Sequence, residues 1–200
     1  MEESPSVLEI IDVMKEKNYR VFNNSKGHDL NIVGIRTSSI KANTFNDWIT
    51  VFYFFDKQWN FFAFPATTDP GTYWRLKTLN VKGTAVLKPG QYRRAYRIGK
   101  HNDKYKALRQ QGDVTVYRDA NRDNILDTEG MPEDTGIFGI NIHRSGEHSA
   151  STLVNKWSAG CQVFQDPDHF KFFLALCEKG RTKFGNSFTY TLLKEEDFEA

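Results

Sequence analysis

The chain has 200 residues, 39% of them hydrophobic, which is enough to bury one sizeable core, and no stretch resembles an interdomain linker. Its 27 basic and 25 acidic side chains are scattered, so the net charge of +2 argues against a nucleic acid or an anionic membrane as a partner. Two cysteines exclude a disulfide framework, no apolar run is long enough for a transmembrane segment, and we expect a single domain over residues 1–200.

The first ten residues are acidic where a secretory signal carries positive charge, so we expect no export signal in this chain. Residues 6–17 have apolar side chains at helical spacing. Ser6 and Glu9 have the spacing of a capping box, and together these features predict an amphipathic helix. Short strands are expected at residues 19–22 and 30–36, with turn-forming residues between them.

Two aromatic and β-branched runs, residues 48–55 and 59–64, are separated by three polar residues and predict a β-hairpin. A strip of aromatic side chains is able to bind sugar rings, but packing in a β-core is the favoured interpretation.

The rest of the chain continues this pattern of short strands. We expect strands at residues 84–87, 92–98, 113–117 and 187–193, and helices at residues 104–110 and 167–180, the second ended by Gly180. About ten short strands with two or three helices indicate a mainly β fold, a β-rich α+β domain. A sandwich or an open barrel with helices at its margins is the expected architecture.

Oxygen-bearing residues crowd one segment between two of these strands. A loop that binds Ca²⁺ collects many of its ligands at every second residue. The same spacing occurs at Asp119, Asn121, Asp123, Ile125 (through its main-chain carbonyl) and Asp127. The sequence therefore suggests a structural calcium site, and the alternative is a polar turn that binds no metal.

A histidine and a cysteine stand at the ends of two short β-like runs in residues 139–164. Residues 139–143 alternate apolar and polar, so His143 emerges at the end of a strand, and Cys161 begins a second run directly after a small-residue turn. Two adjacent strands would bring the imidazole within hydrogen-bond reach of the thiol. A neighbouring imidazolium would then raise the thiolate fraction at neutral pH.

The turn before Cys161 is built of small residues, which let the backbone approach a substrate carbonyl closely. The amides of Gly160 and Cys161 are expected to be free oxyanion donors, with Ser158 supporting the turn. Asn141 lies two residues from His143 on the same strand face and is expected to contact substrate.

Simpler interpretations stand beside this one. A single cysteine and histidine usually mean a buried thiol and a surface imidazole. Cys177 lies on the apolar side of a predicted helix and is expected to be an inert core thiol. His148, in the loop between the two runs, is the rival to His143 as a base.

The pattern of His143, then Ser158, Gly160 and Cys161, resembles the signature of the L,D-transpeptidase catalytic domain. That family comprises bacterial cysteine enzymes that act on peptidoglycan stem peptides. Two departures are visible: Ala159 stands where the family usually has histidine, and Gln162 with Val163 replaces its usual apolar-arginine pair.

The resemblance implies a β-rich fold over about residues 67–164, to which an N-terminal helix and hairpin and a C-terminal helix and strand are additions. It also implies that the main-chain carbonyl of Arg144, just after the histidine, orients the imidazole.

Substrate contacts follow from the same resemblance. Residues 69–73, Asp-Pro-Gly-Thr-Tyr, are similar to the Thr-Pro-x-Gly segment that borders the family's substrate cleft, so Tyr73 is expected beside the substrate. Arg94 is expected to meet a stem-peptide carboxylate, and the alternative is that Arg93, Arg94 and Arg97 form a solvated face.

The expected function is the processing of peptidoglycan or muropeptides by acyl transfer, with Cys161 as nucleophile, His143 as base and no cofactor required for catalysis. Resolution of the acyl-enzyme by water makes an L,D-carboxypeptidase or endopeptidase, and resolution by an amine makes a transpeptidase. The lack of an export signal favours a delivered, phage-type hydrolase, and a trimmed or cytoplasmic chain is the alternative. The alternative function is a non-catalytic cell-wall-binding or phage structural domain that retains the fold.

Overall fold

Long aromatic and β-branched strands form the frame of the molecule. The computed structural model describes residues 3–199. As the sequence predicts, β2 (Asp47–Phe55) and β3 (Gln58–Thr67) pair antiparallel along their whole length. Asp56 and Lys57 both have left-handed backbones, with φ of 52° and 63°, which is the geometry of a two-residue hairpin turn that follows the strand twist.

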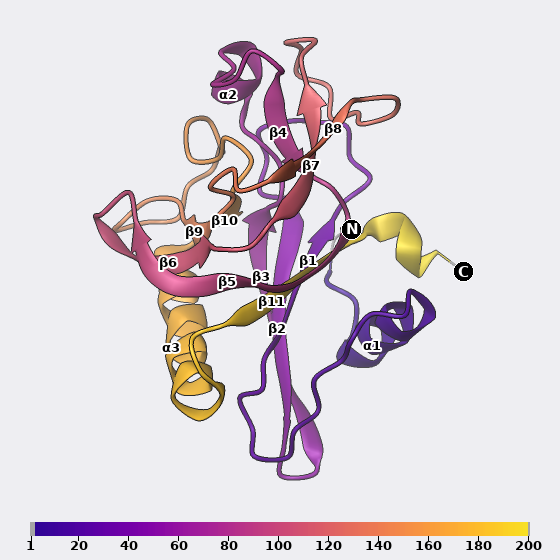
Figure 1. Ribbon diagram of the computed structural model, residues 1–200, viewed down its shortest axis with the longest axis vertical. Helices are drawn as coiled ribbons and strands as arrows, with labels where there is room; N and C mark the ends of the chain where they lie inside the picture. Colours follow the sequence, from indigo (N-terminus) through magenta and orange to yellow (C-terminus); the bar gives the residue numbers. More distant parts are fainter. Residues whose placement is uncertain (1–2, 200) are drawn as a thin grey trace.

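Within residues 3–199, eight strands close into a barrel and three form a separate sheet (Figure 1). The strands besides β2 and β3 are β1 (Asn31–Arg36), β4 (Thr84–Leu87), β5 (Gly90–His101), β6 (Tyr105–Gln110), β7 (Val114–Asp119), β8 (Glu133–Gly136), β9 (Ile142–Arg144), β10 (Gln162–Phe164) and β11 (Phe188–Lys194).

The barrel has the strand order β1, β11, β5, β6, β9, β10, β3, β2, and the separate sheet has the order β4, β7, β8. The pairs β1–β11 and β9–β10 are parallel. The mainly β fold class is confirmed. The barrel is closed rather than open, because β1 pairs with β2 on one side and with β11 on the other.

The helices are α1 (Val7–Glu16), α2 (Thr72–Leu76), α3 (Pro167–Phe184) and the 3₁₀ turn η1 (Glu195–Phe198). Helices α1 and α3 pack against barrel strands, whereas α2 lies beside β4 of the separate sheet (Figure 1). Ser6 and Glu9 form the predicted capping box at the start of α1. No helix among residues 3–199 is long and apolar enough to span a membrane.

The core has two parts because β1 is buried on both faces. Ile32 belongs to the main cluster, to which Phe170 and Phe173 of α3 also contribute. Val33 and Ile35 point the other way, into a second cluster that includes the buried face of α1. A strand that is buried on both faces has a continuous apolar sequence, and residues 32–35 of β1 accordingly have no polar side chain.

Three local predictions are wrong. Residues 19–22 form no strand, because the Asn31 side chain satisfies both the N–H and the carbonyl of Phe22 at 2.8 Å each. Residues 104–110 form β6 instead of a helix, since pairing with β5 overrides local helix propensity. Gly180 does not end α3, which continues to Phe184. Its lack of a side chain serves close packing, because a Cβ there would lie 3.0 Å from the carbonyl oxygen of His28.

Asp47 at the start of β2 ties three strands together from a buried position. Its Oδ1 accepts hydrogen bonds from the backbone and hydroxyl of Thr37, at 2.9 and 3.1 Å. Its Oδ2 accepts the corresponding pair from Thr68, at 2.7 and 2.8 Å. Thr37 follows β1 and Thr68 follows β3, so one carboxylate fixes where all three strands meet.

We predict that Asp47→Asn lowers the free energy of unfolding by about 1–3 kcal/mol, because an amide NH₂ would face N–H and O–H donors and leave a buried donor unpaired. Urea denaturation measures the change. The matched control is Asp56→Asn in the exposed hairpin turn, which should be near neutral since Asn tolerates a left-handed backbone. Equal stability of the two variants would contradict the role of Asp47.

Candidate active site

The predicted histidine lies on β9, which begins only at Ile142 of the expected strand 139–143, and Cys161 immediately precedes the parallel strand β10. Val163 of β10 is opposite His143 of β9, and the Gln162 N–H donates to the Asn141 carbonyl at 2.9 Å, so Cys161 lies beside Asn141. Because side chains alternate along a strand, Asn141, His143 and Cys161 point to the same side. All three line one open cavity of about 730 Å³.

The His143 imidazole is buried and held from several sides. Its Nδ1 lies 2.7 Å from the Arg144 carbonyl oxygen, the acceptor that the motif resemblance implies. The Tyr105 hydroxyl is 3.2 Å from the same nitrogen and donates to the Arg144 carbonyl at 3.3 Å. A bond from Nδ1–H to this carbonyl selects the tautomer in which Nε2 is free to accept a proton.

A second imidazole, that of His101, lies against the first. The two rings stack with centroids 4.1 Å apart and an interplanar angle of 25°. Burial lowers the pKa of His143 to about 3, and the charge of His101 adds to this effect. Burial also raises the pKa of the Cys161 thiol to about 11, although a hydrogen bond from the Asn141 backbone opposes the shift.

At neutral pH the site therefore holds a thiol and a neutral imidazole. Burial of the ring disfavours the imidazolium expected from the sequence, because a charged imidazole would lose its hydration. The thiol donates to the Gly139 carbonyl at 3.4 Å. His143 in this state is suited to act as a general base at the moment of attack, not as the partner of a preformed thiolate.

Ser158 supports the turn that presents the cysteine, as the sequence suggests. Its buried hydroxyl donates to the Cys161 carbonyl at 2.8 Å and accepts from the Gly160 N–H at 3.1 Å. The Gly160 amide is therefore engaged, and the expectation that it is free is wrong. Cys161 N–H has no hydrogen-bond acceptor among residues 3–199 and remains a candidate oxyanion donor.

Gly160 and Gly71 allow the cysteine turn to pack closely. Gly160 has φ of 121°, and a Cβ there would lie 2.4 Å from the Ala85 carbonyl oxygen. The Gly71 N–H donates to the Ser158 carbonyl at 2.9 Å, and a Cβ on Gly71 would lie 2.1 Å from the Asn155 carbonyl oxygen. The Pro-Gly segment therefore lies directly against the loop that leads to Cys161.

Gln162, next to the cysteine, anchors the turn inside the barrel. Its Oε1 accepts a hydrogen bond from the buried Tyr190 hydroxyl at 2.8 Å, and its Nε2 donates to the carbonyls of Thr68 and Gly160. The Tyr190 hydroxyl lies over Gly34, where a Cβ would be 1.9 Å from it. The L,D-transpeptidase motif usually has an apolar residue at this position. Here the position holds Gln162, and the Tyr190 hydroxyl satisfies its side-chain oxygen.

Two further residues of the site, His101 and Tyr105, were not expected from the sequence. They flank the turn between β5 and β6, where Asn102 and Asp103 have left-handed backbones. An Asn-Asp pair between two aromatic rings is a hairpin signal, and the helix assigned to residues 104–110 hid it. Asn141 links this hairpin to β9, because its Oδ1 accepts from the Gln110 N–H at 2.9 Å and its Nδ2 lies 3.1 Å from His101 Nδ1.

Other predicted residues lie farther out. Tyr73, in α2, does not line the cavity of Cys161, although its neighbour Trp74 does. The Lys156 ammonium, which also lines the cavity, lies 4.3 Å from the centroid of the Tyr73 ring. Arg94 lines a different cavity and is not brought to Cys161. His148 is exposed and outside the cavity lining. Cys177 is fully buried in the main core, which confirms it as a core thiol.

The acidic loop is organised around an arginine. Buried Arg75 of α2 forms an ion pair with Asp119 at 2.8 Å and approaches the Asp123 carboxylate at 3.6 Å. Its guanidinium also donates to the carbonyls of Asp123 and Ile125. Three of the five expected calcium ligands thus face a guanidinium, while Asn121 and Asp127 do not contact it.

A calcium ion bound to these oxygens would lie close to the buried positive charge of Arg75, which would repel it. Within residues 3–199, no group of three or more acidic, histidine or cysteine side chains is placed to hold a metal. Arg75 is the cation that these carboxylates contact in the structure, and the calcium site stays a prediction.

Comparisons with known proteins identify no relative. No protein-family model matches the chain, and no match is found among curated proteins or solved structures.

We predict that the alkylation rate of Cys161 by iodoacetamide rises about tenfold per pH unit between pH 7 and 10, because the thiolate fraction grows below a pKa of about 11. Cys177 should be labelled only on unfolding. Mass spectrometry of quenched samples measures both rates. A Cys161 rate that is already flat above pH 7 would show a preformed thiolate and contradict the neutral pair.

We predict that Arg75→Ala lowers stability by about 3–5 kcal/mol, because it leaves the Asp119 carboxylate buried without its cation. The control is Arg122→Ala, an exposed arginine in the same loop, which should be near neutral. The wild-type melting temperature should be the same in chelator and in millimolar calcium. A rise with calcium would restore the calcium interpretation of the loop.

Proposed function

We propose that this chain is a cysteine-dependent acyl-transfer enzyme that processes peptidoglycan stem peptides, by hydrolysis or by transpeptidation. One observation carries the proposal: an imidazole oriented by the Arg144 carbonyl at 2.7 Å shares a cavity with the Cys161 thiol. The substrate class rests on the resemblance of the His-Ser-x-Gly-Cys pattern to the L,D-transpeptidase motif.

The first half of the reaction forms an acyl-enzyme. His143 Nε2 takes the thiol proton as the Cys161 sulfur attacks the carbonyl carbon of the scissile peptide. Because the resting pair is neutral, proton transfer accompanies attack instead of preceding it. The Cys161 N–H donates to the oxygen of the tetrahedral intermediate, and His143 then gives the proton to the leaving amine as the C–N bond breaks.

The second half releases the acyl group from the sulfur. Water, deprotonated by His143, attacks the thioester and yields a carboxylate and the free thiol, which is the hydrolytic outcome. An amine from a second stem peptide attacks in the same way and forms a new peptide bond, which is the transpeptidating outcome.

The cavity lining supports a carboxylate-bearing peptide as substrate. Four basic side chains line it, against a single acidic one, Asp103. Tryptophan and phenylalanine side chains supply apolar contact area beside them. The basic residues are Lys100, Lys104, Arg109 and Lys156, and the aromatic ones are Trp74, Trp157 and Phe138.

A non-catalytic cell-wall-binding or phage structural domain is the second candidate. Two features favour it: burial lowers the pKa of His143 and raises that of Cys161, which favours a neutral pair, and the Gly160 amide is bonded to Ser158 instead of being free. A domain that retained the fold after losing catalysis would show both features.

We predict that the purified protein converts muropeptides and that Cys161→Ala abolishes conversion without unfolding the protein. His143→Ala should lower the rate by about 10²–10⁴-fold because the general base is lost, and His148→Ala should leave the rate unchanged because that ring is exposed and outside the cavity. Chromatography with mass analysis reads the products: loss of a terminal residue indicates carboxypeptidase action, split dimers indicate endopeptidase action, and exchanged termini indicate transpeptidation. Conversion that survives in Cys161→Ala would refute the mechanism, and sacculus binding without conversion would favour the second candidate.

A further inference from the structure

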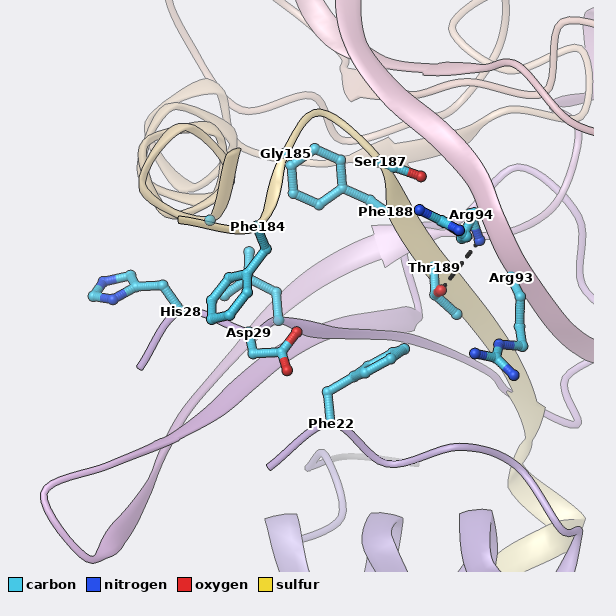
Figure 2. A pocket seen from close by; sticks show the side chains of 12 residues that line it. Phe22, His28, Asp29, Arg93, Arg94, Phe184, Gly185, Ser187, Phe188 and Thr189 are labelled. Carbon is cyan, nitrogen blue, oxygen red and sulfur yellow. Dashed lines mark hydrogen bonds between the residues drawn. The ribbon is translucent and has the colours of Figure 1, made fainter. Parts of the chain in front are cut away.

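A second cavity, of about 220 Å³, shares no lining residue with the cavity of Cys161. It lies where the end of α3, the start of β11, the middle of β5 and the loop of residues 22–30 meet (Figure 2). Three phenylalanine rings form its apolar walls, and its charged groups come from one aspartate and two arginines. These residues are Phe22, Phe184, Phe188, Asp29, Arg93 and Arg94.

The two arginines reach this cavity through an irregularity in β5. Consecutive residues of a regular strand point to opposite faces, yet Arg93 and Arg94 line the same cavity. The register between β5 and β11 shifts between Phe188 and Tyr190, and Arg94 has a left-handed backbone with φ of 57°. A bulge of this kind re-aims side chains, and here both arginines line one cavity.

The bulge is held in place by neighbouring groups. The Arg94 N–H donates to Thr189 Oγ1 at 3.2 Å, as Figure 2 shows. The Ala95 carbonyl accepts from the backbones of Gln111 and Gly112 at 2.7 and 3.2 Å, and the Gln111 side chain donates to the Arg94 carbonyl at 3.1 Å. A left-handed backbone is unfavourable for a residue with a Cβ, so these bonds maintain a conformation that would otherwise relax.

The guanidiniums are available to a ligand. Within residues 3–199, neither Arg93 nor Arg94 has an ion-pair partner, and both side chains are exposed at the cavity. Figure 2 shows the Arg93 guanidinium on the side of Phe22, the Arg94 guanidinium near Phe188, and the Asp29 carboxylate between Phe22 and Phe184. Two arginines and one ionised aspartate leave the lining with a net charge of one positive.

We propose that this cavity binds a small organic monoanion, a carboxylate carried on an aromatic body. A guanidinium matches the planar carboxylate with two parallel hydrogen bonds, and the phenylalanine walls suit a flat apolar ring. An apolar cavity of about 150 Å³ is enough for benzene, so about 220 Å³ holds a ring with its carboxylate. Asp29 selects against dianions such as phosphate, because it repels a second negative charge.

Isothermal titration calorimetry with 3-phenylpropionate tests the proposal, and 3-phenylpropan-1-ol serves as the uncharged ligand of the same shape. Wild-type protein should bind the carboxylate saturably and the alcohol at least tenfold more weakly. The double variant Arg93→Ala with Arg94→Ala should lose at least tenfold in affinity. Arg97→Ala is the matched control, since Arg97 is an exposed arginine of the same strand that does not line the cavity, and it should bind within twofold of wild type.

Asp29→Asn should tighten carboxylate binding, because it removes the negative charge from the lining. Melting temperatures of all variants establish that they fold. The proposal is overturned if folded wild-type protein shows no saturable binding at millimolar carboxylate, or if the alcohol or the double variant binds as well. The proposal is also overturned if Arg97→Ala loses as much affinity for the carboxylate as the double variant does. The carboxylate would then be attracted by the overall positive charge of the strand and not by this cavity.

Discussion

The hydrogen bond from Tyr190 to Gln162, buried inside the barrel, is the interaction on which the candidate site depends. It joins β11 to the residue next to Cys161, at 2.8 Å, and both side chains are fully buried. Gln162 also binds the Thr68 carbonyl, which follows β3, so the turn before Cys161 is tied to two parts of the barrel. A short strand such as β10 has few backbone bonds of its own, and these side-chain bonds fix its position and that of the adjacent Cys161, the proposed nucleophile.

The same arrangement explains why the site is neutral at rest. Placing His143 under His101 and between buried strands orients the ring, but it also removes the water that would solvate an imidazolium. The buried position of His143 therefore has two consequences: the Arg144 carbonyl orients the ring, and the ring disfavours a positive charge. A neutral imidazole of this kind would accept the thiol proton only as the sulfur attacks a bound substrate. The reactivity of Cys161 toward a peptide would then depend on substrate in the cavity.

Features encoded by neighbouring residues could be predicted from the sequence. The capping box of Ser6 and Glu9, the hairpin around Asp56 and Lys57, and the support of the cysteine turn by Ser158 all lie within three residues of their partners. Features set by distant partners could not. β6 is a strand because β5 lies beside it, and Gln162 is buried because Tyr190 lies opposite. The spacing of the acidic loop is calcium-like, but it gives no sign that Asp119 pairs with Arg75, which is 44 residues earlier in the chain.

The central claim is that Cys161 carries the acyl group of a peptide substrate, and acid-quenched mass spectrometry tests it directly. Trypsin separates the two cysteines, since residues 157–171 contain only Cys161 and residues 172–179 contain only Cys177. After brief incubation with muropeptides, the account predicts that peptide 157–171 gains the mass of the acyl part of the stem peptide, while peptide 172–179 is unchanged. Product formation with both peptides unmodified, or an adduct on Cys177, would contradict the account.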